Sequence, residues 1–341
     1  MKKLNFFLLV IIWVQSYSQT SNPIELGKVN WLRDFQASLI ESQKQSKPIL
    51  ILFQEVPGCM TCQRYGEEVL SHPLIVEAIE ALFVPLAIFN NKRGRDAKVL
   101  QMYQEPSWNN PVLRIVDAEG ENILPRYAGE YSPGAVVSFL VDALRLLGTP
   151  VPQYLSLLRE ELSSRDHLSS ATIGMFCFWT GEKVFGSIQG IVDTEAGFMK
   201  SREVVRVQYD PKQVSLEEII EKGSSADCAD EIFLKKDQQK HLQSKISINR
   251  VKQLGEFIPD KTPKYYLSRT HFASVPMSPI QRLKANYLPG SGRSPESVLS
   301  PLQNQMANYI ATQPQIEWSS LIQCTEWHEE YFKLKRKILT P

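Results

Sequence analysis

Two short segments of the chain carry residues that could perform thiol chemistry. In VPGCMTC, two residues separate Cys59 from Cys62, and in FCFWTGE an aromatic pair follows Cys177. A thiolate is the nucleophile in disulfide exchange, and a neighbouring thiol can resolve the mixed disulfide that results. The two segments therefore predict a redox protein that works through its cysteines.

The number of cysteines helps to separate the alternatives for the Cys59–Cys62 pair. The chain has five cysteines, and in an oxidising compartment an odd number leaves at least one thiol free or transiently paired. A purely structural bridge would close a very short loop and gain little chain entropy. Zinc would need about two further ligands, and no second Cys-x-x-Cys motif or His pair accompanies this one. We therefore expect a redox pair, no metal and no other cofactor.

Residues 1–18 have the pattern of a signal peptide. Two lysines precede an apolar run that ends at Val14, and the small residues Ser16 and Ser18 lie where a signal peptidase cleaves, near Gln19. A retained membrane anchor is the alternative, but the run is too short to span roughly 30 Å of hydrocarbon. We expect an exported protein, periplasmic or secreted, with no stable membrane insertion after cleavage.

Length and composition set the scale of the protein. The chain has 341 residues, of which 43% are hydrophobic, so it has room for two domains of ordinary size, each with a core. The formal net charge is only +1. This charge gives no indication of a nucleic-acid partner.

Cys59 is expected where a buried strand passes into a helix. Residues 48–54, PILILFQ, are an apolar run typical of a buried strand, and VPG ends the run just before Cys59. Residues 63–82 place apolar side chains at helical spacing, so Cys59 should lie at a helix N-terminus, where partial positive charge favours the thiolate. Residues 83–89 predict a second strand, and residues 112–124 predict a strand with a turn.

This order of elements, across about residues 25–148, resembles the thioredoxin fold. Asn110 and Pro111 match the cis-proline position of that family, which implies that they bind extended substrate beside the active cysteine. The motif VPGCMTC resembles the VPGUxxT group of bacterial thioredoxin-like proteins and selenoproteins, in which the position of Cys59 can carry selenocysteine. The resemblance implies that Cys59 attacks and that Cys62 resolves the mixed disulfide.

A second resemblance covers about residues 171–235, after a predicted helix. Its motifs are FCFWTGE at 176–182, GIVDTEAGF at 190–198 and EVVRVQYDP at 203–211. They are similar to peptide methionine sulfoxide reductase of the A type. This resemblance implies an α+β domain that reduces the sulfoxide of methionine.

The resemblance also implies roles for individual residues. Cys177 would attack the sulfoxide sulfur, while Phe178 and Trp179 hold the methyl group. Glu203 would protonate or hydrogen-bond the sulfoxide oxygen. A sulfenic acid on Cys177 would result, and another thiol would have to remove it.

The chain departs from that family in two places. Phe198 runs almost directly into Arg202, so the long glycine-rich loop and its oxygen-binding tyrosine are missing. A second tyrosine is expected near Cys228, which could be a resolving thiol or a buried inert one. Three tyrosines of the C-terminal tail could reach the site instead: Tyr265, Tyr266 and Tyr287.

The predicted fold class is α/β, with three parts after the signal peptide. A thioredoxin-like domain spans residues 24–150, a reductase-like α+β domain spans 168–255, and a mostly helical extension spans 256–341. Cys324 and His328 in the extension lie one helical turn apart. With only two possible ligands, they indicate a packed helix face rather than a metal site.

Two functions remain open from the sequence. In the first, the protein is an exported oxidoreductase that reduces peptide methionine S-sulfoxide at Cys177, with Cys59 and Cys62 as the recycling dithiol. Its partners would be oxidised proteins or peptides and an upstream thiol electron donor. In the alternative, the protein is a thioredoxin-like thiol-disulfide oxidoreductase whose reductase-like domain is catalytically degenerate and binds peptide.

Overall fold

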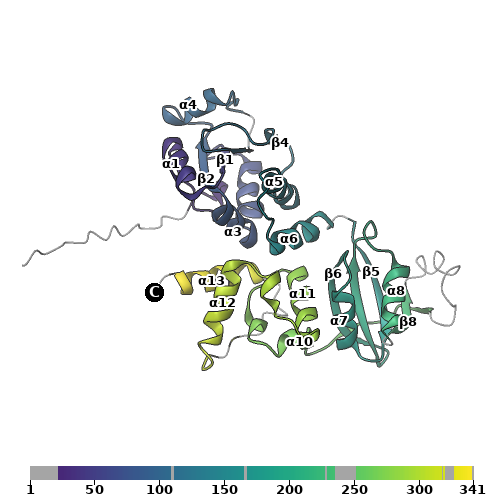
Figure 1. The fold of residues 1–341 in the computed structure, drawn as a ribbon. Helices are drawn as coiled ribbons and strands as arrows, with labels where there is room; N and C mark the ends of the chain where they lie inside the picture. Colours follow the sequence, from purple (N-terminus) through teal and green to yellow (C-terminus); the bar gives the residue numbers. More distant parts are fainter. Residues whose placement is uncertain are drawn as a thin grey trace, which may run out of the picture.

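The computed structural model describes residues 22–108, 111–164, 167–226, 229–234, 251–316, 318 and 326–339. The chain forms two sheets, each packed with helices, and a helical extension that contacts both parts (Figure 1). Among the described residues, no helix combines the length and the apolar character needed to cross a bilayer. The predicted signal peptide lies outside the described residues.

The first sheet has the strand order β2-β1-β3-β4, with β1 parallel to β2 and antiparallel to β3. Its strands are β1 (Ile49–Gln54), β2 (Val84–Phe89), β3 (Val112–Val116) and β4 (Tyr127–Ala128). All six residues of β1 are buried, because helices cover both faces of the sheet. This arrangement confirms the predicted thioredoxin fold.

Alternation along β1 divides the core between the two faces. Ile49, Ile51 and Phe53 pack with side chains of α1 and α4, whereas Leu50 and Leu52 pack with side chains of α3 and α5. The helices of this part are α1 (Phe35–Gln45), α2 (Met60–Arg64), α3 (Pro73–Leu82), α4 (Arg95–Met102), α5 (Pro133–Leu146) and α6 (Gln153–Ser164), with a 3-10 turn at Ile24–Leu26.

The helical region predicted after Cys59 is divided into three pieces. After α2 the chain forms one π-helical turn at Tyr65–Val69, and α3 then begins at Pro73. Proline lacks an N–H and disfavours helical backbone in the residue before it. His72 accordingly has φ −72° and ψ 122°, so the chain leaves the helix there and starts a new one.

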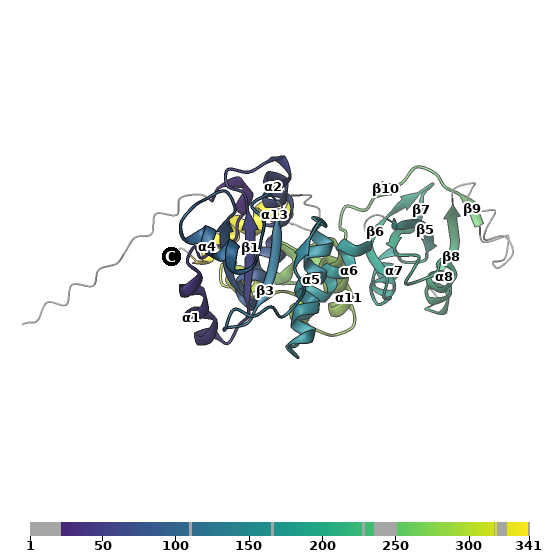
Figure 2. The same ribbon diagram turned by 90° about the horizontal axis from the view of Figure 1, so that it is seen from above.

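The second sheet has the order β10-β6-β7-β5-β8-β9. Its strands are β5 (Ser169–Met175), β6 (Ile191–Met199), β7 (Arg202–Tyr209), β8 (Ala229–Leu234), β9 (Val251–Gln253) and β10 (Ile258–Pro259). Helices α7 (Phe178–Gly186) and α8 (Leu216–Ser225) pack on one face of it (Figure 2). This is the predicted α+β part.

The extension is helical, as predicted. It contains α10 (Tyr265–Ser268), α11 (Pro279–Gly290), α12 (Pro301–Ala311), α13 (Trp327–Leu339) and two 3-10 turns, at His271–Ser274 and Pro295–Val298. At the start of α11, Ser278 and Gln281 form a capping box, and Pro279 is a favourable first residue for a helix.

Helices α11 and α12 begin with a repeated sequence, PMSPIQRLKANY at 276–287 and VLSPLQNQMANY at 298–309. The two copies of the repeat contact each other through Gln281 and Gln303, which are both fully buried. Each side-chain amide donates to the other glutamine's oxygen, at 2.7 and 2.9 Å. Each amide also donates to the carbonyl that opens the opposite repeat, at Val298 or Pro276. The repeat therefore fixes the two helices against each other without an unsatisfied amide.

The extension shares a core with the thioredoxin-like domain. Apolar side chains of α3, α5, α6, α11, α12 and α13 belong to one continuous buried cluster. At its centre the carboxylate of Glu77 accepts hydrogen bonds from the Ser300 hydroxyl at 2.5 Å, the Leu302 N–H at 2.8 Å and the Tyr331 hydroxyl. These contacts join residues more than 200 positions apart in the sequence.

Candidate functional site

Cys59 and Cys62 lie at the start of α2, as the sequence predicted. Cys59 is the residue that caps the helix and is exposed, whereas Cys62 is fully buried one turn further on. Their sulfur atoms are 3.6 Å apart, too far for a disulfide bond. The Cys59 thiol is therefore accessible to a substrate, and the buried Cys62 thiol lies next to it.

The loop before Cys59 is fixed by buried polar groups. Gly58 donates its N–H to a carboxylate oxygen of Glu25 at 2.7 Å, and the Gln54 side chain donates to the carbonyls of Glu25 and Cys62. A side chain at position 58 would place its Cβ 2.3 Å from the Glu55 carbonyl oxygen and 2.7 Å from Cys62 Cβ. Glycine is therefore required for the close approach of the loop to the helix.

The two thiols differ in acidity. The pKa of Cys59 is lowered, chiefly because the Cys62 backbone N–H donates to its sulfur, with smaller contributions from the Cys62 thiol and from Thr61. Burial raises the pKa of Cys62 to about 12, and its contact with Cys59 adds to the shift. Because the thiolate is the attacking species, Cys59 is the better nucleophile of the pair.

Glu55 adds a third chemical group to this site. Within the described residues, Glu55, Cys59 and Cys62 place three possible metal-ligating atoms within 4.8 Å of one another. A structural zinc site needs four protein ligands, so this set is one ligand short. The carboxylate is also close enough to Cys62 to exchange a proton with it, directly or through one water.

Pro111, which the thioredoxin resemblance predicted as a substrate-binding residue, directly precedes β3. It is buried at the start of β3, and Val112, the next residue, pairs with Phe53 near the end of β1 that leads to Cys59. Asn110 and the peptide bond that joins it to Pro111 lie outside the described residues. A cis bond is present at Val56–Pro57, in the loop before Cys59.

Cys177 lies at the corresponding position of the second sheet, between β5 and α7. It caps α7, is partly buried, and carries a free thiol. The N–H of the next residue, Phe178, donates to a carboxylate oxygen of Glu203 at 2.9 Å. The structure therefore places both Cys177 and the carboxylate of Glu203 at the N-terminus of α7.

The β6–β7 hairpin brings Glu203 to this position. Lys200 and Ser201 form its turn with positive φ angles of 48° and 62°, the backbone of a tight two-residue hairpin. The hairpin pairs Phe198 with Glu203, so both lie on the face of the sheet that α7 covers. This two-residue turn stands where the reductase resemblance would place a long glycine-rich loop.

Aromatic side chains surround the start of α7. The ring of Phe178 is buried and lies 5.2 Å from the ring of Phe198 and 5.5 Å from that of Trp179. Trp179 stacks on Tyr265 with ring centroids 4.0 Å apart and an angle of 13°. Cys177 therefore has an apolar seat beside it, which could take the methyl group of an oxidised methionine.

Of the three tail tyrosines considered, Tyr265 is the one that contacts the predicted site. Tyr266 lies against Lys183, and Tyr287 against Arg293. Cys228, the possible resolving thiol, lies outside the described residues, as does Cys324.

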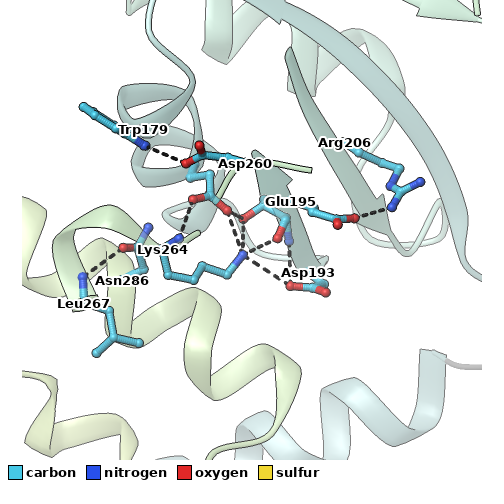
Figure 3. A network of polar contacts seen from close by, with 10 residues as sticks. Trp179, Asp193, Glu195, Arg206, Asp260, Lys264, Leu267 and Asn286 are labelled. Carbon is cyan, nitrogen blue, oxygen red and sulfur yellow. Dashed lines mark hydrogen bonds and ion pairs between the residues drawn. The ribbon is translucent and has the colours of Figure 1, made fainter. Parts of the chain in front are cut away.

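Two groups that reach the second site from the extension, Asp260 and Lys264, were not predicted from the sequence. Asp260 accepts a hydrogen bond from the Trp179 indole at 3.2 Å (Figure 3). Lys264 forms a buried ion pair with Glu182 at 2.8 Å. These contacts join residues 81 and 82 positions apart. No local spacing in the sequence points to such pairings.

The structure does not bring the two cysteine sites together. In Figure 2, α2 and α7 lie on opposite sides of α6 and α11. The polar contacts of the Cys59 loop come from Glu25, Gln54 and Asn91 of the thioredoxin-like part. Those of α7 come from the second sheet and the extension. Each site therefore has its own surroundings.

Comparisons with known proteins find two kinds of similarity. A family model described as thioredoxin-like matches residues 30–118. Peptide methionine sulfoxide reductase MsrA of Thermoactinomyces vulgaris is 37% identical over a match of 67 residues, gaps included, which covers 15% of this chain and 54% of that protein. For MsrA of Methanococcus maripaludis strain C7, the identity is 30% over a match of 69 residues, and the match covers 15% of this chain and 44% of that protein. The chain spans about half the length of the curated relatives it matches.

A solved structure titled DsbH oxidoreductase is also similar to part of the chain. It is 22% identical, with a TM-score of 0.31, over 38% of this chain and 93% of that one. The N-terminal part is thus thioredoxin-like, and a short stretch of the chain is similar to the A-type reductases.

Proposed function

We propose that the protein is an exported thiol oxidoreductase whose primary reaction is disulfide exchange at Cys59 and Cys62. The observation that supports this most strongly is the pairing of an exposed thiol of lowered pKa with a buried thiol 3.6 Å away. The Cys59 thiolate attacks a substrate disulfide, forms a mixed disulfide and releases one thiolate. Cys62 then attacks the Cys59 sulfur, releases the second thiolate, and leaves the Cys59–Cys62 disulfide.

Reduction of a model peptide disulfide tests this reaction, with wild type, Cys59→Ser and Cys62→Ser. Cys59→Ser should abolish exchange, whereas Cys62→Ser should accumulate the mixed disulfide because its resolving thiol is gone. Exchange by Cys59→Ser at the wild-type rate would contradict the proposal.

A second reaction is favoured by the contact between Glu203 and the start of α7. Cys177 attacks the sulfur of a peptide methionine S-sulfoxide, and the oxygen takes up a proton that Glu203 donates or directs. Methionine leaves, and the oxygen remains on Cys177 as a sulfenic acid. A thiol then condenses with the sulfenic acid, releasing water, and a second thiol reduces the resulting disulfide.

The two reactions would form one system if Cys59 and Cys62 recycle Cys177. The position of α2 and α7 on opposite sides of α6 and α11 (Figure 2) favours transfer between two molecules of the chain over transfer within one. Oxidised proteins or peptides would be the substrates, and an upstream thiol donor would reduce the Cys59–Cys62 disulfide. If wild type does not reduce methionine S-sulfoxide with dithiothreitol, this second reaction is excluded and disulfide exchange at Cys59 and Cys62 remains the proposed activity.

A further inference from the structure

The segment between β10 and α10 lies against the face of α7 that carries Trp179. Ile258 and Pro259 pair with Phe198 and Gly197 at the edge of β6, and Asp260 donates its N–H to the Ala196 carbonyl at 2.9 Å. The extension is thereby held beside the aromatic side chains at the start of α7, Phe178 and Trp179. Because the turn between β6 and β7 has only two residues, it does not fold over the edge of β6, and β10 pairs there.

Trp179 is held on two sides by this segment. Its indole N–H donates to the Asp260 carboxylate at 3.2 Å (Figure 3), and its ring stacks on Tyr265 at 4.0 Å. The indole remains partly exposed. A surface tryptophan without such contacts would sample several rotamers, whereas these two contacts fix one orientation.

Lys264 locks the segment in place. It is buried and has a left-handed backbone with φ 54°. Its Nζ donates to Glu182 at 2.8 Å and to the Thr194 hydroxyl at 2.9 Å, and its backbone N–H donates to the other oxygen of Glu182 at 3.0 Å. Because Glu182 belongs to α7, the helix that carries Trp179 also fixes the backbone next to Tyr265.

The Lys264 ammonium group stays charged in the folded protein. Burial by itself would lower the pKa of Lys264, but the negative charges of Glu182 and Asp193 outweigh it and raise the pKa. Lys264 is therefore a cation at neutral pH, and Glu182 has a partner for its own buried charge.

We propose that Asp260 and Tyr265 are positioning residues of the Cys177 site, which hold Trp179 as a rigid wall for a methyl-sulfinyl side chain. The extension pairs with the edge of β6 and thereby supplies one side of the Cys177 site, next to the short β6–β7 turn that stands in place of a long loop. A fixed indole favours binding because no rotamer freedom is lost when the substrate arrives. This inference rests on the proposed reduction of methionine sulfoxide at Cys177.

Substitution of Tyr265 in the full mature chain tests the inference. Tyr265→Ala removes the stacking ring, Tyr265→Phe keeps it, and Tyr309→Ala serves as a matched control because the ring of Tyr309 contacts Trp318 in the extension. The first readout is KM and kcat for a methionine S-sulfoxide peptide with dithiothreitol. The second is the indole N–H signal of Trp179 in a nitrogen-15 correlation spectrum during titration with the same peptide.

Tyr265→Ala should raise KM on the order of tenfold while kcat stays within about twofold, since a binding wall is loosened and the reacting groups are unchanged. Tyr265→Phe and Tyr309→Ala should resemble wild type. An unchanged KM in Tyr265→Ala, or a Tyr265→Phe variant as impaired as Tyr265→Ala, would overturn the inference.

The spectrum separates this inference from the proposed reaction. If wild type does not turn over, the reaction at Cys177 fails, and the peptide titration alone decides on the wall. A shift of the Trp179 indole signal in wild type that is lost in Tyr265→Ala supports the wall. No shift in wild type overturns it.

Discussion

At the scale of residues, position along one helical turn makes two cysteines chemically different. Cys59 lies at the exposed cap and receives a backbone N–H, whereas Cys62 is enclosed by the loop that Gly58 allows to approach. The sequence predicted that Cys59 lies at a helix N-terminus, because the end of a strand and the start of a helix are local features. Cys177 was identified by the motif FCFWTGE, and the structure places it at the start of α7.

Alkylation should distinguish Cys59 from Cys62. Because only the thiolate reacts and its pKa is lowered, the iodoacetamide reaction of Cys59 should reach half its maximum below the pH of about 8.5 that is usual for cysteine. Cys62, with a pKa of about 12, should stay unmodified through pH 9. Peptide mass spectrometry across a pH series measures both. Equal rates at the two cysteines would contradict the assignment.

Glu55 should matter for the second half of disulfide exchange. Cys62 must lose its proton before it attacks, and the Glu55 carboxylate lies within 4.8 Å of it. In Glu55→Gln, formation of the mixed disulfide should be unchanged, while its resolution should slow by at least about tenfold near pH 7.

The exposed Glu67 provides the control for this experiment, as Glu67→Gln. Stopped-flow release of the two thiol products separates the steps. Resolution at the wild-type rate in Glu55→Gln would exclude Glu55 as the proton acceptor.

At the scale of elements, the second site depends on three segments that are far apart in the sequence. Helix α7 carries Cys177, the β6–β7 hairpin carries Glu203, and the turn before α10 carries Lys264. The first two were predicted because each belongs to a motif with fixed spacing. Lys264 was not predicted, because its partner Glu182 lies 82 residues away and only the folded chain brings them together.

Breaking the Glu182–Lys264 pair should destabilise the second sheet. Lys264→Met leaves the buried carboxylate of Glu182 without its cation, which should lower the free energy of unfolding by about 3 to 5 kcal/mol. Adding Glu182→Gln removes the uncompensated charge, so the double variant should recover much of the loss. Urea unfolding of wild type, both single variants and the double variant gives a double-mutant cycle, which measures the interaction energy of the pair. Additive losses would show that the pair does not interact as described.

At the scale of the whole molecule, the extension joins the two α/β parts. It shares a core with the thioredoxin-like domain and supplies β10 and Lys264 to the second one. The sequence predicted three parts but not these junctions, because a buried carboxylate such as Glu77 has no local signature. The boundaries at residues 150, 168 and 255 stay predictions.

Glu77→Ala should loosen the extension from the thioredoxin-like domain. Three hydrogen bonds to a buried carboxylate are lost, so we expect the free energy of unfolding to fall by about 3 kcal/mol and α12 and α13 to become sensitive to protease. Glu80→Ala is the control on the same helix. Glu80 accepts two hydrogen bonds from Asn30 and pairs with Lys335 nearer to solvent, so its loss should cost less, about 1 to 2 kcal/mol. Equal effects of the two variants would contradict the role of Glu77.

The central claim is that one chain carries two separate thiol centres, and mapping of oxidised cysteines tests it most directly. The fully reduced mature protein, freed of reductant and kept dilute, is exposed to either a peptide disulfide or a methionine S-sulfoxide peptide. Mass spectrometry then locates the oxidised residues. We predict that the disulfide oxidises Cys59 and Cys62, and that the sulfoxide oxidises Cys177 with release of methionine. A sulfoxide that leaves Cys177 reduced, or a disulfide that leaves Cys59 and Cys62 reduced, would contradict the claim.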